Sequence, residues 1–218
     1  MTGKERYVNI IIQAERGENR MNIYFTSDLH FGHEYILRAC ERPYADLFEM
    51  ERDLIERWNA RVKGCDKVFI LGDMFYRTEN IIPVLERLKG KKYLIEGNHD
   101  ESWINRIGRG VALRYFEEIS PMMSFSDGER GLTLCHYPLL TYKHQRTTFM
   151  IHGHIHLDTS SDFWELLVAR ERVLNAGVDI NGFSPVTFEE LTENNRRHKI
   201  ENPTRGENRR FGGRDEDR

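Results

Sequence analysis

Side chains that bind metal ions or transfer protons recur in this sequence shortly after short apolar runs. The clearest case is Gly97-Asn98-His99-Asp100, which follows the apolar segment 92–96. The glycine permits a sharp turn, so the three polar residues are predicted to lie at the end of a strand. Alone, this tetrapeptide is only a weak indication of a functional site. The prediction of a functional site becomes strong because similar sets of residues occur elsewhere in the chain.

Four other apolar runs are followed by the same kinds of side chain. Each run is a predicted strand of four or five residues. The residues that follow them are Asp28 and His30 after 22–26, Asp73 after 68–71, His136 after 132–135, and His154 and His156 after 148–151. Open α/β sheets place their ligand sites at the carboxyl ends of the strands. The sequence therefore predicts that these side chains meet in one polynuclear metal site.

Two of the groups are pairs with a spacing of two residues, Asp28 with His30 and His154 with His156. In an extended segment this spacing puts both side chains on the same side. With the three single residues the pairs make seven candidate ligands, too many for one ion, and they fit two ions about 3.5–4 Å apart. Asp73 is the natural bridge, because one carboxylate can offer its two oxygens to two ions.

The donor atoms of this set define the class of metal. Histidine, aspartate and asparagine offer nitrogen and oxygen, and Cys135 beside His136 points to the opposite face if the strand alternates regularly. Such ligands without thiolate suit Mn²⁺, Fe, Ni²⁺, Co²⁺ or Zn²⁺ in a hydrolytic site. We expect two divalent metal ions and favour Mn²⁺.

Composition and charge exclude several classes of protein. The chain has 218 residues and a formal net charge of −3, which gives no general argument for binding nucleic acid or an acidic membrane surface. Its three cysteines are scattered and form neither a disulfide framework nor a CxxC zinc site. No apolar run approaches the roughly 20 residues of a membrane span, and the first residues lack the apolar stretch of a signal peptide. We expect a cytoplasmic protein.

The first hundred residues predict the elements that position the first three groups. Helices at 34–41, from Asp46 to Gly64, and from 81 to about Lys89 alternate with the strands, a pattern typical of parallel βαβαβ units. The second helix begins with the pattern of a capping box at Asp46. Its apolar stripe comprises Leu47, Met50, Leu54 and Trp58. This stripe should pack the helix on the sheet.

The second half of the chain differs, because few predicted helices separate its strands. Short strands at 120–125, 132–135, 148–152 and 172–176 predict a second, largely antiparallel sheet. A last helix begins with a capping box at Thr187 and ends near Arg197. From His198 the sequence is polar, and we expect disorder at 198–218. Residues 1–20 are an extension of uncertain order, and we slightly favour Met21 as the natural start.

Together these blocks resemble the motif set of the calcineurin-like metallophosphoesterases. Its five parts, in the family's order, are Asp28-x-His30, Gly72-Asp73, Gly97-Asn98-His99-Asp100, His136 and Gly153-His154-x-His156. The segments 25–28, 42–44, 136–138 and 175–179 also resemble small stand-alone bacterial and phage phosphoesterases. The resemblance implies an α+β fold, a four-layer α/β/β/α sandwich of two mixed sheets flanked by helices. The metallophosphoesterase domain would span 21–197.

The resemblance also implies a role for each motif residue. A first metal ion would be held by Asp28, His30, Asp73 and His156, and a second by Asp73, Asn98, His136 and His154. His99 matches the family's proton-donating histidine, and Asp100 is placed to orient it. A hydroxide that bridges the two ions would attack phosphorus while protonated His99 donates to the leaving alkoxide. His33 and His152 are predicted to support the ligands.

We favour a phosphodiesterase, because an alkoxide leaving group benefits from an acid such as His99. Two alternatives stay open: a phosphomonoesterase acting on a nucleotide or a phosphoprotein, and a metal-binding scaffold without turnover, against which the full ligand set argues. The expected partner is a small phosphate ester, a class that includes nucleotides. Four residues that follow site strands are candidate substrate contacts: Arg42, Tyr44, Tyr76 and Arg77.

Overall fold

The computed structural model describes residues 21–204, so the predicted extension at 1–20 and most of the predicted tail lie outside the described residues. The strands are β1 (Ile23–Thr26), β2 (Lys67–Ile70), β3 (Lys91–Ile95), β4 (Phe116–Ser120), β5 (Met122–Ser126), β6 (Gly131–Cys135), β7 (Thr148–His152) and β8 (Val173–Asn175). The helices are α1 (Ile36–Ala39), α2 (Leu47–Arg61), α3 (Ile81–Arg87), α4 (Asp100–Ile107), α5 (Arg109–Ala112), α6 (Phe163–Val168) and α7 (Phe188–Glu201), with a 3₁₀ turn at Val178–Ile180. Across 21–204, no helix combines the length and the apolar character that a bilayer span requires.

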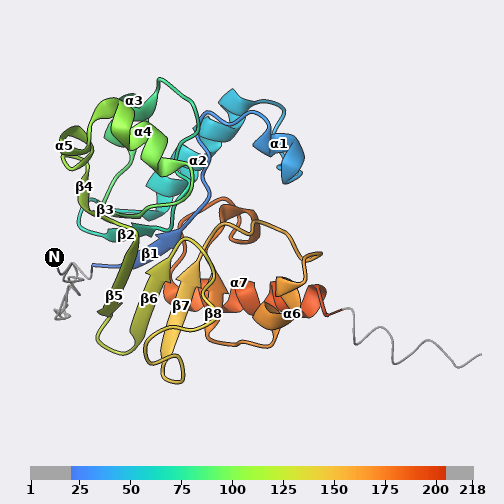
Figure 1. The fold of residues 1–218 in the computed structure, drawn as a ribbon. Helices are drawn as coiled ribbons and strands as arrows, with labels where there is room; N and C mark the ends of the chain where they lie inside the picture. The colour runs from blue at the N-terminus through green and yellow to red at the C-terminus, as the bar shows by residue number, and fades with distance from the viewer. Residues whose placement is uncertain (1–20, 205–218) are drawn as a thin grey trace, which may run out of the picture.

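The strands form two four-stranded sheets that pack face to face, with helices outside them (Figure 1). Side-chain alternation explains this packing. In β2, Val68 and Ile70 join the core beneath the helices of the first half, whereas Phe69 joins the core between the sheets. In β7, Ile151 faces the first sheet and Met150 packs with Trp164 of α6. The predicted α+β sandwich of two sheets flanked by helices is confirmed.

The first sheet has the order β1-β2-β3-β4 and is parallel throughout. The predicted βαβαβ unit is therefore present, but β4, α4 and α5 were not anticipated. Sequence reasoning placed one strand at 120–125, whereas the structure divides this segment at Pro121. Proline has no N–H to donate to a ladder, and there the chain leaves the first sheet and enters the second.

The prediction of a largely antiparallel second sheet is wrong. Only β5 and β6 are antiparallel, whereas β6–β7 and β7–β8 are parallel pairs. A parallel pair needs a crossover of about a dozen residues or more. The loop 136–147 and the segment that contains α6 serve as these crossovers, and α6 itself was not expected from the sequence.

The helix ends agree with the predictions only in part. Asp46 caps α2 by accepting a hydrogen bond from the backbone N–H of Glu49 at 2.8 Å, but the carboxylate of Glu49 accepts from Ala45, so the capping box is half formed. The capping box at Thr187 is complete. Helix α7 contacts the edge strands β1 and β8 and continues to Glu201. The domain boundary drawn at 197 therefore falls within a helix.

Candidate metal centre

The turns after β1 and β7 bring one group of candidate ligands together. Asp28, His30 and His156 offer ligand atoms that all lie within 4.8 Å of one another. The Nε2 atoms of His30 and His156 are 3.3 Å apart. The backbone N–H of His154 donates to the carboxylate of Asp28 at 3.0 Å, which joins the two turns directly.

A second group forms around Asp73, His136 and His154, whose ligand atoms also lie within 4.8 Å of one another. Oδ1 of Asn98 is 3.1 Å from Nε2 of His136. Oδ2 of Asp73 lies 3.6 Å from Nε2 of His136 and 3.8 Å from Nε2 of His30. Asp73 therefore lies between the two groups, and all seven candidate ligands converge.

The predicted extended geometry of the two pairs is wrong. Asp28, His30, His154 and His156 have φ values of 58°, 53°, 72° and 47°, in the left-handed region, and Asp73 has 53°. Residues other than glycine seldom adopt positive φ, and such strain persists only where the surroundings enforce it. Tight turns, not strand alternation, direct these side chains to one point.

Two glycines permit the close approach of the ligand turns. A Cβ atom at Gly97 would lie 2.4 Å from Oδ1 of Asp73, and one at Gly72 would lie 2.4 Å from Nδ1 of His136. Gly72 also has φ of +91°, which favours glycine, whereas Gly97 is required because any side chain there would collide with Asp73. Side chains at either position would separate the turns after β2 and β3.

The carboxylates of Asp28 and Asp73 are buried without a lysine or arginine partner. The residues are 0% and 2% exposed, and within 21–204 their ion-pair contacts are with histidine alone. Burial raises the pKa of Asp28, because the charged form loses hydration. Buried charges in folded proteins are normally paired or bound to metal. The two carboxylates therefore fit the cations that the sequence predicts.

The histidine nitrogens support the same conclusion. Nδ1 of His136 donates to the carbonyl of Leu71 at 2.6 Å, which directs Nε2 away from the backbone. Nε2 lies 3.1 Å from Oδ1 of Asn98, so the two atoms point to the same place. Both are donor atoms that one divalent cation can share. The donor set thus fits divalent metal ions on its chemistry and its geometry.

Asp179, at the end of the second sheet, orients His156 and was missed as a functional residue. Nδ1 of His156 donates to Oδ2 of Asp179 at 2.8 Å, which turns Nε2 toward the ligand group. Burial lowers the pKa of His156, but the hydrogen bond to Asp179 and nearby charges outweigh it and raise the pKa to about 10. An acidic residue soon after β8 was the signal that could have identified this role.

Arg42, a predicted substrate contact, lies buried behind the candidate centre. The residue is 4% exposed. Its guanidinium donates to both carboxylate oxygens of Asp179, to the carbonyls of Asp28 and Leu29, and to the sulfur of Met50. All five N–H groups are thereby used. Arg42 holds the turn after β1 and neutralises Asp179 from behind the candidate centre.

Tyr44, also a predicted substrate contact, is held by two neighbouring residues. Its hydroxyl donates to Asp53 of α2 at 2.7 Å, and its ring packs edge-on against Phe183 at 5.3 Å. Burial and the hydrogen bond to Asp53 raise the pKa of Tyr44. The tyrosine thus ties the segment after α1 to the first core.

We expect Arg42→Leu to destabilise the metal-free protein by about 3–5 kcal/mol, because it leaves Asp179 as a buried, unpaired carboxylate. The melting temperature should fall by roughly 6–20 °C. Arg52→Leu is the matched control, since the side chain of Arg52 on α2 is 53% exposed and forms a long i,i+4 ion pair with Glu56 at 3.9 Å. Thermal unfolding in EDTA measures both variants. If Arg42 were a substrate contact, its replacement would leave stability unchanged and raise KM.

The carboxylate of Asp100, which was predicted to orient the ring of His99, is hydrogen-bonded to the ligand turns. Its carboxylate accepts hydrogen bonds from the backbone N–H groups of Gly97 and Asp73, both at 2.8 Å, and of Met74 at 3.0 Å. The indole N–H of Trp103 donates to it at 2.7 Å. These bonds tie the turn after β2 to the turn after β3. Asp100 is therefore a positioning residue for the loop that contains Asp73.

His99 stands at the open edge of the candidate centre. Its Nε2 is 3.8 Å from Oδ2 of Asp73, and its side chain is 33% exposed. The backbone N–H of His99 donates to Oδ1 of Asp73 at 3.0 Å. The ring packs edge-on against Tyr76 at 4.9 Å and His30 at 5.5 Å. The ring of His99 thus lies beside the candidate ligands and is partly open to solvent.

The two remaining histidines near the ligands lie behind them. Nδ1 of His33 is 3.2 Å from Nδ1 of His30, and the ring of His33 stacks on Tyr76 at 3.9 Å. His152 is buried and hydrogen-bonds through Nδ1 to the carbonyl of Gly153 at 2.9 Å. Burial lowers the pKa of His152 to about 4, so this ring is neutral at physiological pH.

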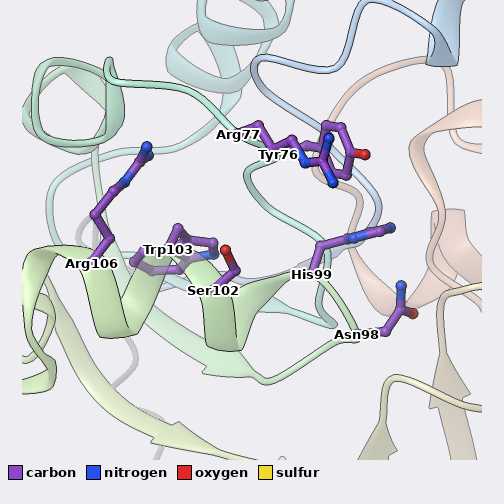
Figure 2. Close-up of a pocket in the computed structure, with 7 residues that line it drawn as sticks. All are labelled: Tyr76, Arg77, Asn98, His99, Ser102, Trp103 and Arg106. Carbon is purple, nitrogen blue, oxygen red and sulfur yellow. The ribbon is translucent and has the colours of Figure 1, made fainter.

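Two cavities without a common lining residue border the candidate centre. The smaller, about 330 Å³, lies between the loop after β2 and α4, and Figure 2 shows Tyr76, Arg77 and His99 on its wall. The larger, about 560 Å³, lies between α1 and the segment 154–158 and is lined mainly by apolar side chains. The smaller cavity includes Asn98 and the larger includes His154 and His156. Each cavity therefore opens onto candidate ligands.

Comparison with known proteins identifies relatives along most of the chain. The family profile described as calcineurin-like phosphoesterase matches residues 21–201. The chain is 29% identical over 170 residues to the uncharacterized protein MJ1445 of Methanocaldococcus jannaschii, a match that covers 77% of this chain and 87% of that protein. It is 29% identical over 192 residues to the Gene 66 protein of Mycobacterium phage L5, covering 70% and 92% of the two chains.

A solved structure shows the same fold. The protein of unknown function AQ665 from Aquifex aeolicus matches with a TM-score of 0.59 and 24% sequence identity. The match covers 78% of this chain and 97% of that chain. At this level of identity the likeness concerns the arrangement of the sheets and helices alone.

Proposed function

The chain belongs to the calcineurin-like phosphoesterase family, and from this premise we propose that it is a phosphodiesterase. Membership makes the protein a metal-dependent phosphoester hydrolase with small phosphate-ester substrates. The assignment to diesters rests on one observation, the two separate cavities at the candidate centre. A diester has two organic groups on phosphorus and a monoester has one. A site with two cavities accommodates both groups of a diester.

We propose that the converging ligands bind two divalent cations, with Mn²⁺ the favoured ion. The first ion takes Asp28, His30, Asp73 and His156, and the second takes Asp73, Asn98, His136 and His154. The two ligand groups and the position of Asp73 between them support this division. Bound there, the cations offset the negative charge of the phosphate and ease the deprotonation of water near neutral pH.

His99 is the proposed donor of a proton to the leaving oxygen. Its ring lies beside Asp73 and on the wall of the smaller cavity, so a leaving group in that cavity is within its reach. A positioned acid contributes most when the leaving oxygen is a poor leaving group. Asp100 holds the turn that presents His99, and Asp179 holds the ring of His156.

A substrate panel with Mn²⁺ tests the proposal. It comprises bis-p-nitrophenyl phosphate, p-nitrophenyl phosphate, and 2′,3′- and 3′,5′-cyclic nucleotides. We expect kcat/KM for a diester to exceed that for the monoester by roughly tenfold or more, a difference of about 1.4 kcal/mol in transition-state binding. A preference for the monoester would indicate a phosphomonoesterase, and metal-loaded protein without any turnover would indicate a scaffold.

A variant that fills the larger cavity tests the two-cavity argument directly. Ala39 lines this cavity at the end of α1. Ala39→Trp should lower kcat/KM for bis-p-nitrophenyl phosphate and leave p-nitrophenyl phosphate unaffected, because a monoester needs only the smaller cavity. Ala45→Trp is the control, since Ala45 is exposed and lines neither cavity. Equal losses on both substrates would contradict the assignment of the cavity.

A further inference from the structure

The smaller cavity lies on the side of the candidate centre where His99 stands. Tyr76 and Arg77 come from the loop after β2, and Ser102 and Arg106 from α4, with His99 between these walls (Figure 2). If His99 gives its proton to the leaving oxygen, the rest of the leaving group occupies this cavity. The chemistry of the wall then decides which leaving groups bind well.

The charge of this wall is positive and unbalanced. Arg77 is exposed and, within residues 21–204, forms no ion pair; its guanidinium lies over the ring of Tyr76 at 5.2 Å. The nearest acid in sequence, Glu79, is taken by Arg106, whose Nη1 donates to it at 2.8 Å. Among the described residues, no aspartate or glutamate lines the cavity. The guanidinium of Arg77 is therefore available to bind an anion in this cavity.

The loop that presents Arg77 is anchored. The backbone N–H of Tyr76 donates to the carbonyl of Phe31 at 2.8 Å. A Cβ atom at Gly32 would lie 2.5 Å from the carbonyl oxygen of Tyr76, so the two loops are in close contact. Arg77 itself has φ of 45°, in the left-handed region. A guanidinium on an anchored backbone loses less freedom when it binds an anion.

The larger cavity differs in charge. Beside its apolar residues, its lining includes Glu41 and Asp158 together with His154 and His156. An anion on the group retained by phosphorus would enter a cavity with two acidic residues and, in the described part of the chain, no arginine or lysine in its lining, whereas an anion on the leaving group would meet Arg77. The two ends of the proposed diester site are therefore not equivalent.

We propose that the smaller cavity selects leaving groups with a second anionic group, a phosphate or a carboxylate, which Arg77 binds through its planar fork of N–H donors. The preferred substrate is then a phosphodiester whose leaving alcohol is itself negatively charged. This inference rests on the proposed function, because it assigns one of the two groups of the diester to one cavity. Arg77 is a specificity-determining residue in this reaction.

Three chromogenic diesters test the inference. The reference is methyl 4-nitrophenyl phosphate. The second is methyl 3-carboxy-4-nitrophenyl phosphate, which has a carboxylate on the leaving phenol. The third is 2-carboxyethyl 4-nitrophenyl phosphate, which has the carboxylate on the retained group. Each is assayed with the full-length, metal-loaded wild type, Arg77→Gln, and the control Arg52→Gln on the exposed face of α2.

We expect Arg77→Gln to lower the ratio of kcat/KM for the second substrate over the reference by roughly ten- to a hundredfold, the range of a hydrogen bond to a charged group. The ratio for the third substrate over the reference should not change, and Arg52→Gln should change neither ratio. An unchanged first ratio, or equal losses on all three substrates, would overturn the inference and leave the phosphodiesterase proposal intact. Absence of hydrolysis of every diester by the wild type would overturn both.

A binding measurement gives a second readout. Calorimetry in EDTA follows the free phenol, 3-carboxy-4-nitrophenol, as it binds the metal-free protein. The wild type should bind it more tightly than Arg77→Gln by at least roughly tenfold, whereas 4-nitrophenol should not distinguish the two proteins. Equal affinities for the carboxylated phenol would contradict the role of Arg77.

Discussion

Asp73→Asn should reduce metal-dependent phosphoester hydrolysis by at least roughly a thousandfold, since bound cations contribute several kcal/mol of charge stabilisation that this variant loses. Oδ2 of Asp73 lies 3.6–3.8 Å from Nε2 of His30, His99 and His136, which places this carboxylate between both ligand groups. Asparagine has the same shape and keeps an acceptor for the backbone N–H of His99. It has no negative charge and one oxygen, so it cannot serve two cations.

Metal content and stability together identify the cause of this loss. After loading with Mn²⁺ and gel filtration, we expect about two ions per wild-type chain and a clearly smaller content in Asp73→Asn. The metal-free variant should melt no lower than the metal-free wild type, because it loses a buried carboxylate that has no lysine or arginine partner. Glu117→Gln, at an exposed position of β4, is the control. Two ions in Asp73→Asn, or one in the wild type, would overturn the proposed bridge.

The sequence predicted the fold correctly from β1 to β3, where the apolar pattern of each segment agrees with the order in which strands and helices alternate. In the first half, the apolar runs of β1, β2 and β3 alternate with helices such as α2, whose stripe from Met50 to Trp58 is buried as expected. Each run is followed by polar residues, which are not expected to pack in a hydrophobic core. Because parallel strands end at one edge of the sheet, chain order alone was enough to bring Asp28, Asp73 and Asn98 together.

The second sheet shows what such reasoning misses. Whether two strands pair parallel or antiparallel depends on the end of the sheet at which the connecting segment delivers the second strand. The sequences of the loop 136–147 and of the short α6 do not reveal this end. Pro121 indicates an interruption in the sequence. A proline between two apolar stretches does not, however, predict that the stretches belong to different sheets. Long-range packing decides both cases.

The supporting residues of the site were harder to predict than its ligands. Arg42 and Tyr44 follow a site strand in sequence, yet Arg42 is buried against Asp179 and Tyr44 bonds to α2. Asp179 is far from His156 in sequence and close to it in space. Motif spacing identifies residues that share a turn. It does not identify a hydrogen-bond partner such as Asp179, which lies on a different element of the fold.

His99→Ala should reduce turnover by roughly 10²–10⁴-fold for a diester with a poor leaving group, the usual share of a general acid. A nucleoside alkoxide is such a group. With p-nitrophenolate, which needs little protonation, the loss should be much smaller. His144→Ala is the control, since His144 is an exposed histidine outside both cavities. The ratio of kcat for the two kinds of substrate is the measured quantity.

Two rival roles for His99 make different predictions. The ligand atoms of His99 group with those of His30 and Asp73 within 4.8 Å, so His99 is also placed to bind metal. As a ligand, its loss would lower the metal content in parallel with activity. As a structural residue, its loss would lower the melting temperature and reduce kcat equally for good and poor leaving groups. Only a proton donor predicts full metal content together with a loss that depends on the leaving group. A uniform loss at full occupancy by both ions would contradict the assignment of His99 as the acid.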